Sequence, residues 1–165
     1  MFSYILAVLC GALFLGVDQF TKHYIMSNFE LGQSKEFING FIDIVYIHNR
    51  GGAWGMLSGY TWILLSISAV VMLVCIALLF KLGLDNKLMF WAITLVIFGG
   101  TGNMIDRIFR NGNVIDFLHF EFFPTFPVFN IADCAIVIGC GLLILYFIID
   151  TFRSSNHKEI GNINE

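Results

Sequence analysis

The sequence predicts an all-α membrane protein with four transmembrane helices and a small β-sheet at the membrane surface. Of its 165 residues, 58% are hydrophobic and only 13% are charged, whereas soluble domains carry about 25% charged residues. The mean hydropathy is +0.80. The length suits a single domain. A net charge of -3, with no basic patch, gives no indication of nucleic-acid binding.

Four segments have the length and polarity of spanning helices, which need about 20 mostly apolar residues. They are residues 2–20, 61–80, 87–105 and 132–152. In lipid a helix satisfies its own backbone polar groups, so four helices are the natural interpretation. No Lys or Arg precedes the first segment and no small-residue cleavage site follows it, so we expect a retained helix rather than a cleaved signal peptide.

The connections between these segments are unequal. A short link joins the second and third, whereas long stretches separate the other pairs. With four spans, both long stretches emerge on one side, and the short link and both termini lie on the other. Lys and Arg residues divide almost equally between the two sides, so the positive-inside rule does not decide the orientation.

The two long stretches differ in character. Residues 27–59 contain Asn39-Gly40 between apolar residues, which predicts a hairpin, and "FIDIVYIH", which predicts a strand. Residues 113–133, "NVIDFLHFEFFPTFPVFNIAD", are too aromatic for an ordinary soluble loop and too interrupted for a membrane helix. We expect a loop that dips toward lipid as a lid or an anchor. Residues 1–152 then form one domain, followed by a polar tail, residues 153–165, without regular structure.

Two aspartates in this second stretch are the strongest candidates for chemistry. Asp116 lies in the apolar "VIDF", and Asp133 begins the fourth helix three residues after Asn130. An acid in the first turn is also favoured as a helix cap, so capping alone could explain Asp133. Two carboxyl groups that share a proton can activate water for peptide hydrolysis, one as base and the other as acid.

Two other polar groups lie at helix ends. Asp18 and Lys22 share a helix face at i,i+4 spacing, either as an interfacial helix end that snorkels or as a clamp beside a site. In "GGTGNMIDR" the glycines remove side chains near the end of a helix, so another backbone or a substrate can approach closely. Asn103 and Arg107 share a helix face from which Asp106 points away. The alternative to a functional role is that the glycines serve helix packing and that Arg107 lies at the membrane interface.

Other chemistry has little support. The histidines lack H-E-x-x-H spacing, no G-x-S-x-G elbow is present, and the four cysteines show no metal-ligand spacing, so we expect no metal and no cofactor. A proton-coupled transporter is an alternative, since intramembrane carboxylates often relay protons, although no polar path crosses the spans. A scaffold with a capping Asp133 and a turn residue at Asp116 is a third possibility.

The order of the motifs resembles one family, the lipoprotein signal peptidases or signal peptidases II, over the whole chain apart from the tail. The motifs are "DQFTK" from Asp18, "NRGGAWG" from Asn49, "GNMIDR" from Gly102, "VIDF" and "FNIAD".

The resemblance implies a bacterial aspartic endopeptidase of the cytoplasmic membrane, with its site and β-sheet at the extracytoplasmic face. Asp116 and Asp133 would be the catalytic dyad. The substrate would be a prolipoprotein, cut just before a diacylglyceryl-modified cysteine, and globomycin-like peptides would inhibit. Membrane lipid would be a partner, and we expect a monomer. The residues expected to line or support the site are Asn49, Gly51, Asn103, Arg107 and Asn130, with Asp18 and Lys22.

Overall fold

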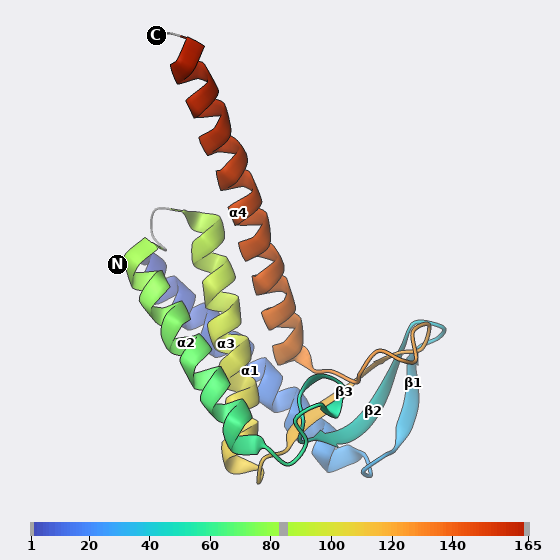
Figure 1. The fold of residues 1–165 in the computed structure, drawn as a ribbon. Coiled ribbons are helices and arrows are strands. Elements are labelled where there is room, and N and C mark those ends of the chain that lie inside the picture. Colours follow the sequence, from blue (N-terminus) through green and yellow to red (C-terminus); the bar gives the residue numbers. More distant parts are fainter. Residues whose placement is uncertain (1, 83–85, 164–165) are drawn as a thin grey trace.

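Four long helices and a three-stranded sheet make up the fold (Figure 1). The computed structural model describes the backbone of residues 2–82 and 86–163. The helices are α1 (Phe2–Asn28), α2 (Thr61–Leu82), α3 (Lys87–Phe109) and α4 (Ile131–Ile163), and a short 3-10 turn, η1, spans Ala53–Gly55. Each long helix contains a segment apolar and long enough to cross a membrane, which confirms the predicted spans.

Three helices extend further than the sequence predicts. α1 continues to Asn28 and α3 to Phe109, so that Lys22 and Arg107 lie inside helical turns rather than beyond them. α4 continues to Ile163, and the expectation of an irregular tail after Arg153 is therefore wrong up to that residue. No proline follows Arg153, and helix propagation adds one hydrogen bond for each residue that is fixed.

α3 is the central helix of the bundle. Half of its membrane-spanning window is buried inside the protein, against 6% for α2, which lies at the periphery. The close packing of α3 on α4 depends on glycine. A Cβ on Gly99 would lie 2.6 Å from the carbonyl oxygen of Ala132, and one on Gly139 would lie 2.7 Å from that of Ala92. These helices meet through backbone contact, as small residues allow in membranes.

The sheet joins the two long connections of the chain. Its antiparallel order is β1 (Ser34–Ile38), β2 (Ile42–Asn49) and β3 (Val114–Phe120). The hairpin predicted at Asn39-Gly40 is confirmed, and Gly40 takes the positive φ of 71° that the turn requires. β3 was not predicted. The sequence placed Asp116 in a loop or turn, whereas it lies on this third strand, opposite Ile47.

Alternation along β3 explains why a strand forms there. Ile115 and Phe117 are buried and pack with Ile25 of α1 and Tyr46 of β2. Successive strand residues point to opposite faces of a sheet. Asp116, between these two residues, therefore faces away from the apolar cluster, and toward the bundle side that carries α3 and α4.

We predict that Gly102→Ala destabilises the bundle. A Cβ at this position would lie 2.6 Å from Asp18 Oδ2 and 3.2 Å from Ala132 Cβ, both of them buried. Overpacking of this kind costs about 1–3 kcal/mol of unfolding free energy. Thermal unfolding in detergent measures the loss. Gly16→Ala, in α1 with open space around its Cβ, is the matched control and should cost nothing; equal stability of the two variants would contradict the prediction.

Candidate active site

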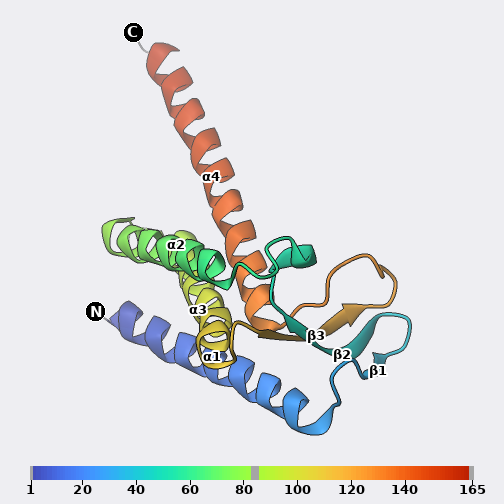
Figure 2. The ribbon, with the colours of Figure 1, turned by 60° about the horizontal axis from the view of Figure 1, so that its bottom comes forward.

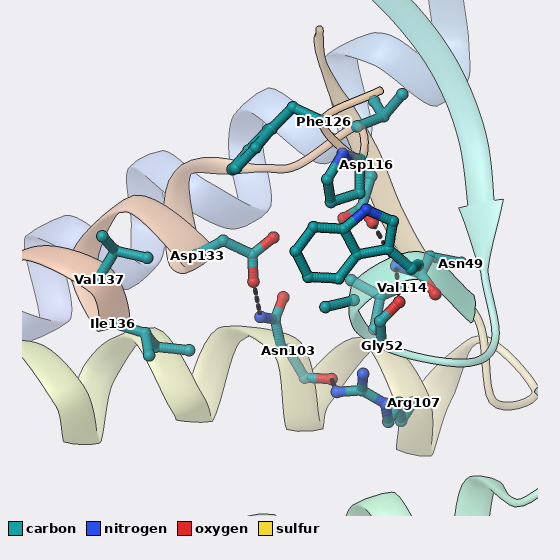
Figure 3. Close-up of a pocket in the computed structure, with 14 residues that line it drawn as sticks. Asn49, Gly52, Asn103, Arg107, Val114, Asp116, Phe126, Asp133, Ile136 and Val137 are labelled. Atoms are coloured by element: carbon teal, nitrogen blue, oxygen red, sulfur yellow. Dashed lines mark hydrogen bonds between the residues drawn. The ribbon is translucent and has the colours of Figure 1, made fainter. Parts of the chain in front are cut away.

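Asp116 and Asp133 face the same cavity. It has a volume of about 320 Å³ and is also lined by Asn49, Asn103 and Arg107. The two acids come from β3 and from the first turn of α4, and Figure 3 shows both carboxyl groups projecting into the shared space. The structure thus brings together the pair that the sequence singled out, and places it at the end of the bundle where the sheet begins.

Asp116 is 1% exposed and has a hydrogen-bond donor on each carboxylate oxygen. Asn130 Nδ2 donates to its Oδ1 at 2.6 Å, and Asn49 Nδ2 donates to its Oδ2 at 2.8 Å. Burial, followed by the nearby charge of Asp133, raises the pKa of Asp116 to about 7, although the two amide donors oppose the shift. This carboxyl group can therefore carry a proton near neutral pH.

Asp133 is both a helix cap and a member of the cavity wall. The backbone N–H of Asn130 donates to its Oδ2 at 3.1 Å, and its own N–H donates to Asn130 Oδ1 at 2.9 Å, the reciprocal pattern of a capping box. Its Oδ1 accepts a further bond from Asn103 Nδ2 at 2.7 Å. The capping interpretation is therefore correct, and it orients the carboxylate in the site.

Asn103 and Asn130 connect the two acids. The Oδ1 atom of Asn103 accepts from Lys22 Nζ at 3.1 Å and from Asn130 Nδ2 at 3.0 Å. These two donors identify Oδ1 as the acceptor, which leaves the Asn103 amide nitrogen to donate to Asp133. The orientation of one side chain on α3 is thus fixed from α1 and from the start of α4.

Lys22 is a fully buried ammonium held by two carboxylates. Its Nζ lies 3.0 Å from Asp18 Oδ2 and 3.0 Å from Asp106 Oδ2, and all three side chains are 0% exposed. Asp18 also accepts a 3.0 Å bond from the backbone N–H of Ala132. Because the Lys22 ammonium is buried in the protein, it does not reach out to the membrane interface, and the snorkelling interpretation is wrong. The structure supports the clamp interpretation instead.

Sequence reasoning assigned no role to three residues of this network, Gln19, Asp106 and Arg110. Asp106 Oδ1 accepts from Gln19 Nε2 at 2.9 Å and is paired with Arg110, while its Oδ2 accepts from the backbone N–H of Ile115 at 3.1 Å. The prediction that Asp106 points away from the face of Asn103 is wrong, because both side chains contact Lys22 Nζ, and the sequence assigned Asp106 no role. The i,i+4 spacing of Asp106 and Arg110 was the available signal.

Asn49 is held in place by the loop that follows β2. The backbone N–H of Gly51 donates to Asn49 Oδ1 at 2.9 Å, and Asn49 Nδ2 also contacts the carbonyl of Gly52 at 3.2 Å. A Cβ on Gly51 would lie 2.5 Å from the carbonyl oxygen of Gly55. Gly51 therefore acts by allowing this tight loop and orienting Asn49. It does not line the cavity.

Arg107 lines the cavity beside Asn103. Its Nη1 donates to the backbone carbonyl of Asn103 at 3.4 Å, and its Nε is buried without a hydrogen-bond partner among the residues that the structure describes. Buried donors are usually paired, and an unpaired one at a cavity indicates a partner that binds there. Within the described ranges, no group of three or more His, Cys, Asp or Glu side chains could hold a metal ion.

The fold and the site define a multi-pass membrane protein with two buried carboxyl groups at one cavity. The family model for signal peptidase (SPase) II matches residues 10–149, and the chain belongs to that family. It is therefore a membrane peptidase.

Curated relatives and solved structures agree. The chain is 37% identical to the lipoprotein signal peptidase of Enterococcus faecalis, with 91% of this chain and 92% of the relative covered, and 40% identical to that of Bacillus pumilus, with 91% and 94% covered. A bacterial membrane enzyme solved by the in meso method at 2.3 Å resolution superimposes with a TM-score of 0.84 at 35% identity, over 88% of this chain and 89% of that one.

We predict that Lys22→Met strongly destabilises the protein. The substitution leaves the carboxylates of Asp18 and Asp106 buried without their cation, and breaking a buried ion pair in this way costs about 3–5 kcal/mol of unfolding free energy. Thermal unfolding of the purified variant measures the loss. Lys35→Met, at an exposed lysine on β1, is the control and should unfold like the parent. An unchanged unfolding temperature for Lys22→Met would contradict the structural role of the ammonium.

Proposed function

We propose that the chain is an aspartic endopeptidase that removes the signal peptide from diacylglyceryl-modified prolipoproteins, cutting just before the lipidated cysteine. The observation that carries the proposal is the pair of buried carboxyl groups, Asp116 and Asp133, facing one cavity at the end of an apolar bundle. The names of the relatives, lipoprotein signal peptidase, support the class of substrate.

The surroundings of the two acids suggest separate roles. Asp116, with its pKa near 7, carries the proton, and Asp133 is the ionised partner, since its place in the first turn of α4 favours a negative charge. Asp133 takes a proton from an attacking water, whose oxygen bonds to the scissile carbonyl carbon while Asp116 protonates the carbonyl oxygen. The C–N bond then breaks as the leaving nitrogen takes the proton from Asp133, and one hydroxyl of the intermediate returns its proton to Asp116, which restores both acids.

The remaining polar groups of the cavity hold the substrate backbone. Arg107 has a buried Nε without a partner among the described residues, so it can donate to a substrate carbonyl. Asn49, the last residue of β2, donates to Asp116 at the edge of the cavity. Trp54 of the loop that follows donates from Nε1 to the carbonyl of Thr125 at 3.3 Å and so bridges the two segments beside the cavity.

An apolar groove beside Asp133 suits the lipid part of the substrate. It holds about 260 Å³ and is lined by Phe120, Phe126, Phe129, Asp133, Cys134, Val137 and Ile138. Val137 is 69% exposed on a spanning segment, so the groove opens toward lipid. An acyl chain of the modified cysteine could lie there and bring the adjacent peptide bond to the two acids.

The proposed location follows from the same arrangement. The two connections that form the sheet and carry or precede the two acids join the first span to the second and the third to the fourth, which supports a location of both acids on one side of the membrane. We propose that this side is the extracytoplasmic face of a bacterial cytoplasmic membrane. Globomycin-like peptides would block the enzyme by occupying the cavity between the acids. We further propose that the protein acts as a monomer in contact with membrane lipid, without a cofactor.

The dyad is tested by single amide substitutions. Asp116→Asn and Asp133→Asn should each lower cleavage of a lipidated precursor by at least about 10²–10⁴-fold, the usual contribution of one acid–base group. A gel-shift assay in proteoliposomes measures cleavage, with an unlipidated precursor run in parallel. Asp43→Asn, on β2 and 3.9 Å from His119, is the control and should retain activity. Normal processing by either dyad variant would overturn the assignment.

The pKa of Asp116 predicts a pH limit on the rate. The proposed mechanism needs a protonated Asp116, and this group loses its proton as the pH rises through about 7. The value of kcat/KM should therefore fall above that pH, with the macroscopic titration belonging to the pair. Rates measured across pH 5 to 9, with the unfolding temperature followed over the same range, check this. A rate that keeps rising to pH 9 in folded enzyme would contradict the role of Asp116.

A further inference from the structure

Six phenylalanine rings form a continuous cluster between the sheet and the start of α4. The aromatic cluster consists of Phe41, Phe120, Phe122, Phe123, Phe126 and Phe129. The centroid of the Phe120 ring lies 4.9 Å from that of Phe129, 5.1 Å from that of Phe122 and 5.5 Å from that of Phe126. The rings therefore hold one another in a defined surface.

The outer rings of this cluster are exposed. Phe122 is 61% exposed, Phe123 50% and Phe41 46%. Scattered apolar side chains are ordinary on a protein surface, but contiguous ones indicate a partner. Phe41 and Phe122 stack with an interplanar angle of 5° and so present one joint apolar face.

The cluster continues into the surface of α4 that faces lipid. Phe120, Phe126 and Phe129 line the same apolar groove as Val137 and Ile138, which are 69% and 56% exposed on a spanning helix. Figures 1 and 2 show the β1–β2 hairpin end and the loop after β3 lying together out to the side of the bundle, from where the chain returns to the start of α4. The exposed rings thus extend an established lipid-facing surface.

The backbone of the loop is suited to an apolar surrounding. Pro124 and Pro127 have no N–H group to satisfy. The N–H groups of Phe123, Phe126 and Phe129 donate to backbone carbonyls at 3.2, 3.0 and 2.9 Å. A non-helical segment does not lie exposed to lipid within the hydrocarbon core, because unpaired backbone groups are costly away from water, so the loop backbone stays at the headgroup boundary and only its rings reach further in.

The charge of the segment favours acyl chains over headgroups. The chain contains no Lys or Arg from residue 111 to residue 152, so the cluster has no cation with which to attract anionic lipid. Glu121 is exposed and accepts a 2.7 Å bond from the backbone N–H of Gly40. The carboxylate of Glu121 limits how deeply the aromatic cluster can enter the bilayer, because this charged group must remain at the level of the lipid headgroups.

We propose that the aromatic cluster inserts into the upper acyl region of the leaflet in which α4 begins, as a second membrane contact outside the four spans. The occupant is bilayer lipid. Because Phe120 lies on β3, four residues after Asp116, the contact fixes the depth of the strand that carries this acid. The proposal does not depend on the peptidase mechanism, since lipid contact can be measured without turnover.

Spin labelling in vesicles tests the contact. Cys10, Cys75, Cys134 and Cys140 are free, so each is changed to alanine, and Phe123→Cys is labelled with a nitroxide. Phe37→Cys provides the matched control, because Phe37 is 66% exposed but lies on the opposite face of the sheet, in a hollow shared with Lys35 and Glu36. In phosphatidylcholine–phosphatidylglycerol vesicles, the accessibility to oxygen relative to a water-soluble nickel chelate should be several-fold higher at position 123 than at 37.

The outcomes separate the possible occupants. Water-like accessibility at both positions would overturn the proposal. Spin–spin broadening between labels at position 123, without oxygen accessibility, would assign the surface to a second copy of the chain and also overturn it. If the variant at position 123 fails to fold, Phe122→Cys provides the same measurement on a neighbouring exposed ring.

Discussion

The buried ammonium of Lys22 is the constraint on which the site depends. Removing a charge from water is favourable only when its partners are well placed, and Asp18 and Asp106 each lie 3.0 Å away at full burial. Through these contacts α1 is bonded to α3. Asp18 also accepts from the start of α4 at Ala132, and Asp106 from β3 at Ile115, so one cation fixes the four elements that surround the acids.

The two acids are held by amides rather than by cations. Asn103 and Asn130 share a bond to each other and each donates to one carboxylate, while Lys22 contacts Asn103 from behind. An amide cannot neutralise a carboxylate as a direct ion pair would. Burial and the neighbouring charge therefore dominate at Asp116 and raise its pKa toward neutrality, as the proposed acid–base mechanism requires.

Much of the fold and the site could be predicted from the sequence. The four spans follow from apolar runs, the hairpin from Asn39-Gly40, and the pairing of Asp18 with Lys22 from i,i+4 spacing. β3 was missed because it runs directly into residues 121–129, whose prolines and phenylalanines obscure the alternation along the strand. The role of Asp106 was missed because only its spacing to Arg110 is local, whereas its other partners come from α1 and from the strand after α3.

The sequence by itself determined the chemistry available: an apolar chain, two isolated acids, and polar residues spaced to share helix faces. Periodicity and polarity are local properties and can be read directly. Only the tertiary structure decided that Asp116 and Asp133 face one cavity, and that the six phenylalanines join into a surface continuous with α4. These arrangements depend on long-range packing, where backbone contact at Gly99 and strand pairing between distant segments set which groups meet.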